Sequence, residues 1–270
     1  MSDEEVGTAL ERFEPNIKLL SGAVSGLESV LRRAEKLDDE RVIAAQPYLG
    51  LIWLYSSAIL DLLHTKRQDG RFLWNAPALA ALCRPLQEAL LSFIYFCIEQ
   101  PPPEEFEFRQ LLLARHSSHK RWDLLSRADQ SKENIAREYA SALTEVEAKN
   151  RAISEHPFLT KLDHKVASAI LNKGDKYMVD SLDMVWERAC LPRGIYDVTF
   201  RYLSQFAHAT PYAALSLNNH KADHEDGAVN MSIPVTLALV CVVKTIDCAG
   251  DLHPDLEALL PPAFSDFMGS

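Results

Sequence analysis

The chain has 270 residues, 47% of them hydrophobic and 24% charged, with 10 glycines and a formal net charge of −10. These values predict a globular protein with a sizeable core, and the scarcity of turn-forming glycine disfavours an all-β fold. The acidic balance repels phosphate backbones at long range, so nucleic acid is not the default partner.

Apolar residues recur at helical spacing along the first third of the chain. The pattern predicts helices over residues 16–36 and 41–67, followed by a loop at 68–77 that contains the turn signal Asp69-Gly70. A strongly apolar helix is expected over residues 78–99. The stretch "EQPPPEE" ends this helix, because consecutive prolines cannot continue it.

The rest of the chain continues the helical pattern. Residues 105–128 and 131–155 predict two longer, more charged helices, and the composition of 131–155 is typical of an exposed amphipathic helix. Shorter helices are expected near residues 160–172, 177–190, 194–209, 232–249 and 252–262. We find no alternation typical of strands. The sequence therefore predicts an all-α fold, an irregular bundle of about eight to ten helices in one domain over residues 1–270, with 105–155 as a protruding hairpin.

The apolar runs and the cysteines bear on the cellular compartment. The longest runs cover residues 49–60, 89–98 and 233–243, and each is shorter than the roughly 18–20 residues that span a bilayer. The first residues, "MSDEEVGTAL", lack the order of a signal peptide. The five cysteines include no C-x-x-C pair and predict reduced thiols. We expect a cytoplasmic protein that makes no membrane contact.

The stretch "RGIYDVTFRYLSQFAHATP", residues 193–211, holds the first candidate site. Five polar residues fall on one face of its expected helix, and they are Asp197, Arg201, Ser204, Gln205 and His208. A second face, with Val198, Tyr202 and Phe206 at intervals of four residues, is expected to turn towards a core. The polar stripe is either a solvated helix edge with a modest Asp197–Arg201 pair or a functional site.

A second candidate lies in "ALCRPLQEALLSFIYFC", where Arg84 and Glu88 are one helical turn apart among apolar residues. One interpretation is a largely buried ion pair that fixes the packing of the helix. The other is that Arg84 or Glu88 faces His208 across a pocket, with Glu88 holding one imidazole nitrogen.

Arg201 and His208 also match the spacing R-x6-H, as do Arg109 and His116, while Arg151 and His156 are closer together. A histidine can move a proton near neutral pH, and an arginine can stabilise the charge on a reacting phosphate. The Arg201–His208 pair resembles the Arg-x(4–6)-His signature of the HEPN superfamily of all-helical domains. This resemblance implies a metal-independent ribonuclease or defence toxin that acts as a dimer, with Arg201 and His208 catalytic.

The segments "RPLQEALLSFIYF" and "YLSQFAHATP" also resemble an uncharacterised bacterial family of helical proteins. Members of that family combine an Arg-x-x-x-Glu helix with a later Tyr, Ser and His segment. The matching residues here are Arg84 and Glu88, then Tyr202, Ser204 and His208, over a region of roughly residues 75–250. The resemblance implies binding roles for Arg84, Glu88, Tyr202 and Ser204.

Metal and cofactor sites are not expected. His220 and His224 in "HKADHEDG" have H-x-x-x-H spacing, but the stretch reads as a solvated acidic loop without a third ligand. Nucleotide-binding glycine motifs and the G-x-S-x-G motif do not occur in the sequence. The sequence thus leads to two hypotheses. The first is a ligand-binding or protein-interaction module, expected to be a homodimer. The second is the HEPN-like ribonuclease, with RNA as its partner.

Overall fold

The computed structural model describes residues 3–65, 76–129, 131–174, 176–207 and 225–257. Within these residues it contains nine α-helices, short 3-10 and π segments, and no strand. The expectation of an all-α bundle of eight to ten helices is confirmed. The chain divides into two compact units, one formed by residues 1–98 and 182–270 and the other by residues 99–181.

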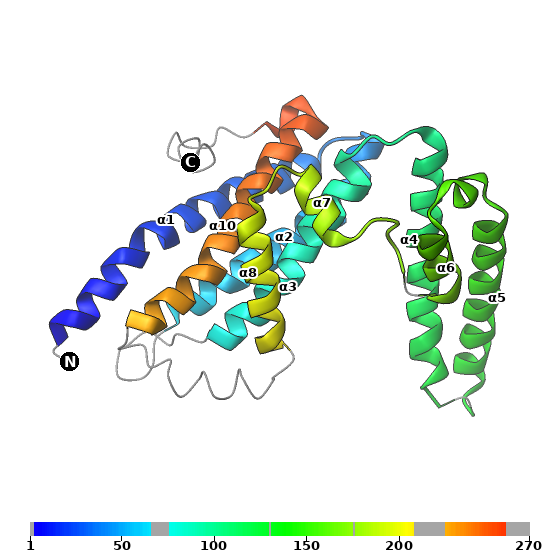
Figure 1. Cartoon of the computed structure of the whole chain (residues 1–270), viewed down its shortest axis with the longest axis horizontal. Coiled ribbons are helices and arrows are strands. Elements are labelled where there is room, and N and C mark those ends of the chain that lie inside the picture. Colours follow the sequence, from blue (N-terminus) through cyan, green and yellow to red (C-terminus); the bar gives the residue numbers. More distant parts are fainter. Residues whose placement is uncertain (1–2, 66–75, 130, 175, 208–224, 258–270) are drawn as a thin grey trace. The chain divides into compact units, whose positions relative to one another are not determined.

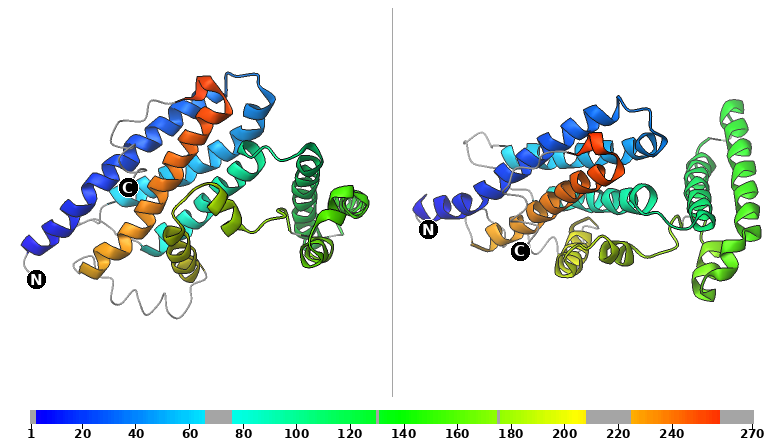
Figure 2. Two further views of the ribbon diagram at one scale, coloured as in Figure 1. Left: turned by 45° about the horizontal axis from the view of Figure 1, so that its top comes forward. Right: turned by 90° about the horizontal axis from the view of Figure 1, so that it is seen from above.

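The first unit is a bundle in which helices distant in sequence lie side by side (Figures 1 and 2). Its helices are α1 (Asp3–Ala34), α2 (Glu40–His64), α3 (Ala76–Phe93), α7 (Leu182–Arg188), α8 (Arg193–Ala207) and α10 (Glu225–Leu252). Helix α1 packs on α10 and α2, and α3 packs on α2, α8 and α10. This arrangement places the most apolar helices together and leaves α7 and α8 beside α3.

Local sequence explains where the helices of this unit begin and end. Asp39 caps α2, because its carboxylate accepts hydrogen bonds from the backbone N–H groups of Arg41 and Val42 at 2.9 and 3.0 Å. Helix α3 continues into a π-helical turn, Ile94–Ile98, before the prolines end it. The core is made of fully buried aliphatic and aromatic side chains such as Leu27, Leu49, Phe93 and Val242.

Three helical segments are long and apolar enough to cross a membrane, judged by length and composition only. They are Glu40–His64, Pro77–Ile98 and Ser232–Leu252. The apolar windows of the last two are 61% and 72% buried within the structure, whereas that of the first is 33% buried. Isolated polar residues divide these segments into apolar runs that are each too short to span a bilayer, so the sequence did not indicate them. The absence of membrane contact therefore stays a prediction.

The second unit consists of α4 (Pro103–Ser126), α5 (Glu133–Glu155), a 3-10 turn (Pro157–Lys161) and α6 (His164–Asn172). Helices α4 and α5 form the hairpin that the sequence predicts for residues 105–155. The unit containing this hairpin also includes α6 and has a core of its own. That core is formed by Phe108, Leu112, Ile153, Leu159 and Ile170.

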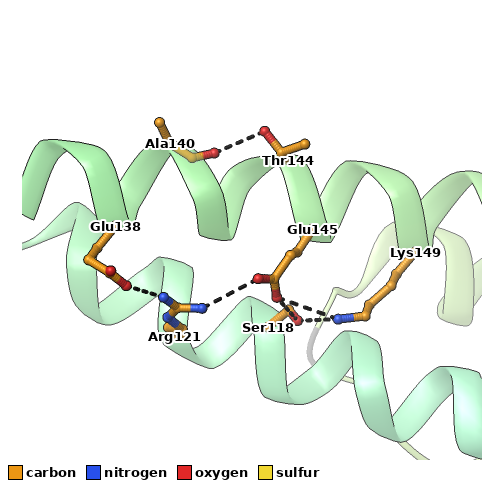
Figure 3. A network of polar contacts seen from close by, with 7 residues as sticks. All are labelled: Ser118, Arg121, Glu138, Ala140, Thr144, Glu145 and Lys149. Carbon is orange, nitrogen blue, oxygen red and sulfur yellow. Dashed lines mark hydrogen bonds and ion pairs between the residues drawn. The ribbon is translucent and has the colours of Figure 1, made fainter.

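A polar network joins α4 to α5 (Figure 3). The Ser118 hydroxyl donates to the Glu145 carboxylate at 3.0 Å and accepts from the Lys149 ammonium at 2.5 Å. Arg121 pairs with Glu138 and, at 3.4 Å, with Glu145. These pairs are partly exposed, so each contributes little stability, but together they fix how the two helices pair.

Two arginines of α4 are buried rather than exposed. Arg109 is 5% exposed and pairs with Glu99 at 2.7 Å and with Glu105 at 2.5 Å. Arg115 is 1% exposed and donates to the carbonyl oxygens of Ile170 and Lys176 at 2.7 and 2.9 Å. The sequence predicts a charged helix here but gives no sign that these two side chains are buried. Carboxylates close in the sequence enclose Arg109, whereas main-chain carbonyls distant in the sequence enclose Arg115.

Candidate functional site

The turn between α7 and α8 brings the two helices into position for a site. The N–H of Cys190 bonds to the Glu187 carbonyl at 3.0 Å, and the N–H of Leu191 bonds to the Trp186 carbonyl at 3.4 Å. This pattern is a Schellman motif, with Cys190 at the left-handed position, φ 55°. The indole N–H of Trp186 donates to the Pro192 carbonyl at 3.1 Å, which ties α7 to the start of α8.

The Cys190 backbone gives a prediction for stability. A residue with a side chain is strained by about 1 kcal/mol in the left-handed region, whereas glycine is not. Cys190→Gly is therefore expected to raise the free energy of unfolding by up to about 1 kcal/mol, measured by urea denaturation. The neighbouring Ala189 does not have a positive φ, so Ala189→Gly is the matched control and should destabilise. A loss of stability in Cys190→Gly as large as in the control would contradict the strain argument.

A pocket of about 300 Å³ lies at α7 and α8. Its lining combines three carboxylates, two guanidinium groups and two aromatic rings, contributed by Asp183, Trp186, Glu187, Arg193, Tyr196, Asp197 and Arg201. A volume of about 300 Å³ is at the lower end of the range for small-molecule sites. The size and the mixed charge suit a small polar molecule better than a polymer.

The charges around the pocket are partly paired with one another. Glu187 of α7 and Arg193 of α8 form an ion pair at 2.8 Å. Asp197 and Arg201 are exposed and lie one turn apart on α8, so they present opposite charges to the same pocket.

Tyr196 lies in the pocket within electrostatic reach of charged residues on α3. Its ring lies 5.4 Å from that of Trp186. Burial raises the pKa of the Tyr196 hydroxyl, and the carboxylates of Asp183, Asp197 and Glu88 raise it further, while Arg84 opposes them. The Tyr196 hydroxyl therefore stays protonated at neutral pH and acts as a hydrogen-bond donor.

The predicted pair of Arg84 and Glu88 is present. The Arg84 guanidinium donates to the Glu88 carboxylate at 2.7 Å and to the Ser204 hydroxyl at 2.5 Å. The side chains of Arg84 and Glu88 are 23% and 41% exposed, so the expectation of a largely buried pair is wrong. The contact with Ser204 links α3 to α8 and brings together three of the residues that the sequence predicts for a site.

The other predicted residues have different outcomes. Arg201 lines the pocket. His208 lies outside the described residues, as do His220 and His224, and so does the side chain of Tyr202. Consequently the proposed contact of His208 with Arg84 or Glu88 stays a prediction. In the described part of the chain, histidine, cysteine and acidic residues form no group of three that could hold a metal ion.

Sequence reasoning missed five of the seven residues that line the pocket, namely Asp183, Trp186, Glu187, Arg193 and Tyr196. Asp183 and Trp186 belong to α7, which has only seven residues and is too short for a clear periodic signal. Tyr196 directly precedes Asp197 at the start of α8. This neighbouring aromatic and acidic pair is the one sequence signal that could have placed the site near α7.

Comparisons with known proteins do not add to this description. No family model, curated protein or solved structure matches the chain.

Proposed function

We propose that the chain is a helical ligand-binding module and that its ligand is a small zwitterion that enters the pocket at α7 and α8. The observation that carries the proposal is the lining of that pocket, where Asp197 and Arg201 offer opposite charges beside two aromatic rings. An ammonium group would pair with the Asp197 carboxylate, and a carboxylate would pair with the Arg201 guanidinium. The half-buried ring of Tyr196, backed by the fully buried Trp186, supplies an aromatic surface for the rest of the ligand.

The surrounding contacts hold this site in place. Arg193 and Glu187 neutralise each other across the pocket, and Arg84 ties α8 to α3 through Ser204. Preorganised side chains lose less conformational freedom when a ligand binds, which lowers the free-energy cost of binding. A zwitterion also satisfies both signs of charge, whereas a simple anion would meet the carboxylates of Asp183, Glu187 and Asp197.

Three probes with the same aromatic body test the charge preference: phenylalanine, phenethylamine and 3-phenylpropionate. We expect phenylalanine to raise the thermal midpoint of the protein most, phenethylamine less and 3-phenylpropionate least, because only the first satisfies Asp197 and Arg201 together. Differential scanning fluorimetry at millimolar ligand measures the order. An order led by 3-phenylpropionate, or no shift with any of the three, would refute the zwitterion site.

The HEPN-like ribonuclease is the second candidate, and the position of Arg201 in a pocket favours it. Cleavage of a mixed RNA by the protein in EDTA, lost in both Arg201→Ala and His208→Ala with folding intact, would support it. We place it second because the three carboxylates of the pocket repel a phosphodiester.

We also propose that the protein works in the cytoplasm. Its cysteines are free thiols, and four of the five are buried. Burial raises the pKa of the thiols of Cys97 and Cys248 to about 12 and about 11, which keeps them protonated and unreactive. Free buried thiols are typical of a reducing compartment.

A further inference from the structure

The outward face of α2 carries exposed apolar side chains where a solvent-facing helix usually carries polar ones. Residues Val42, Leu49, Ile52, Ile59 and Leu63 turn inward and are almost fully buried. On the opposite side Ile43, Leu51 and Leu54 are 47%, 42% and 55% exposed. These three are among the seven large hydrophobic residues that the described part of the chain exposes. Together with Pro47 and Ala58 they form a continuous stripe, which we call the α2 face.

Burial within the bundle does not explain this stripe. The apolar windows of the other two long apolar segments are 61% and 72% buried, whereas only 33% of the α2 window is buried. Large contiguous apolar patches on soluble proteins mark interaction sites. Gly50 lies beside the α2 face, and a Cβ added there would meet nothing within 4 Å. The approach to this part of the helix is therefore open.

We infer that the α2 face is the interface of a homodimer, in which α2 of one copy packs antiparallel against α2 of the second. The outward half of a 25-residue helix, about 37 Å long and about 11 Å across, has an area of roughly 600 Å². Two copies would then bury at most about 1,200 Å² in total, which is the lower limit for a specific interface. An area of this size predicts a dimer that dissociates on dilution.

The two-fold symmetry of such a dimer makes the interface self-complementary. With the axis near the middle of α2, Leu51 of one copy lies against Leu54 of the second, and Pro47 lies against Ala58. The outer turns contribute Glu40 and Asp61, which lie in line with the stripe. Acidic residues at both ends of the stripe and a net charge of −10 disfavour an anionic lipid surface as the occupant. The same charges repel a second copy, which keeps the dimer weak. The dimer inference does not depend on the α7–α8 pocket.

Sedimentation equilibrium of the full chain from about 1 to 200 μM tests the interface. The wild type is expected to move from 30.3 kDa towards twice that mass as its concentration rises. Leu54→Glu should weaken dimerisation by about 100-fold or more, because the symmetry buries two unpaired carboxylates. Leu124→Glu is the matched control: Leu124 is 72% exposed on α4, and its replacement should leave dimerisation unchanged.

Circular dichroism checks that each variant folds, and Leu51→Glu provides a second variant of the same face. A wild type that stays monomeric over the whole range would overturn the inference, and so would a dimer that both α2 variants leave intact. Co-sedimentation with phosphatidylcholine vesicles and with mixed phosphatidylcholine–phosphatidylserine vesicles tests whether a membrane surface covers the α2 face instead. Vesicle binding by a monomeric wild type, lost in Leu54→Glu, would assign the α2 face to a membrane instead.

Discussion

Arg115→Met is expected to lower the free energy of unfolding of the unit formed by residues 99–181 by about 3–5 kcal/mol. The Arg115 guanidinium donates to three carbonyl oxygens, those of Ile170, Lys173 and Lys176, at 2.7, 3.4 and 2.9 Å. The first of these carbonyls belongs to the last turn of α6, where the helix itself offers no N–H partner. Methionine fills the space but leaves these acceptors without the guanidinium.

Urea denaturation followed by circular dichroism measures this loss, and hydrogen exchange assigns it to α4 and α6. Arg115→Lys keeps the charge but lacks the planar fork, so its loss of stability should be intermediate. Arg137 is 75% exposed in an ion pair with Glu133, and Arg137→Met should change stability by less than about 0.5 kcal/mol. A change in Arg115→Met as small as in this control would show that the carbonyl contacts are dispensable.

Arg109→Met is expected to destabilise the same unit by a similar amount, about 3–5 kcal/mol, for a different reason. Arg109 is 5% exposed between Glu99 and Glu105, which are 17% and 23% exposed, and the Asp180 carboxylate lies 3.9 Å from it. Without the guanidinium, three poorly solvated carboxylates repel one another.

A triple variant separates charge from packing at this site. In Arg109→Met combined with Glu99→Gln and Glu105→Gln, two of the three carboxylates are removed along with the guanidinium. Most of the lost stability should return, because replacing a whole buried ion pair with neutral groups is often close to neutral. Urea midpoints of the single and triple variants give the comparison. A triple variant less stable than Arg109→Met alone would contradict the electrostatic explanation.

The sequence predicted the helices well where their apolar period was long. Helix α5, expected over residues 131–155, runs over Glu133–Glu155, and α4, expected over 105–128, runs over Pro103–Ser126. The sequence could not predict the burial of Arg109 and Arg115, because charged residues are usually exposed and the partners of Arg115 are main-chain carbonyls about 55 to 61 residues away. Periodicity shows which residues share a face of a helix but not which helix lies opposite.

The candidate site shows the same limit. The spacing of Arg84 and Glu88 predicted their ion pair correctly. The hydrogen bond from Arg84 to Ser204 joins residues 120 positions apart. The sequence proposed both residues for a site, but no sequence pattern predicts a contact between them. The pocket itself depends on α7, whose seven residues are too few to show a period, and on a left-handed turn at a cysteine.

Isothermal titration of the wild type and of Arg201→Ala with phenylalanine and phenethylamine tests the zwitterion site most directly. Arg201 is exposed, so its removal should leave the fold intact. If Arg201 pairs with the ligand carboxylate, Arg201→Ala should weaken phenylalanine binding about 10- to 100-fold, the value of one charge-assisted hydrogen-bonded pair, and leave phenethylamine binding unchanged. An equal loss for both probes, or wild-type protein that binds neither, would contradict the proposed function.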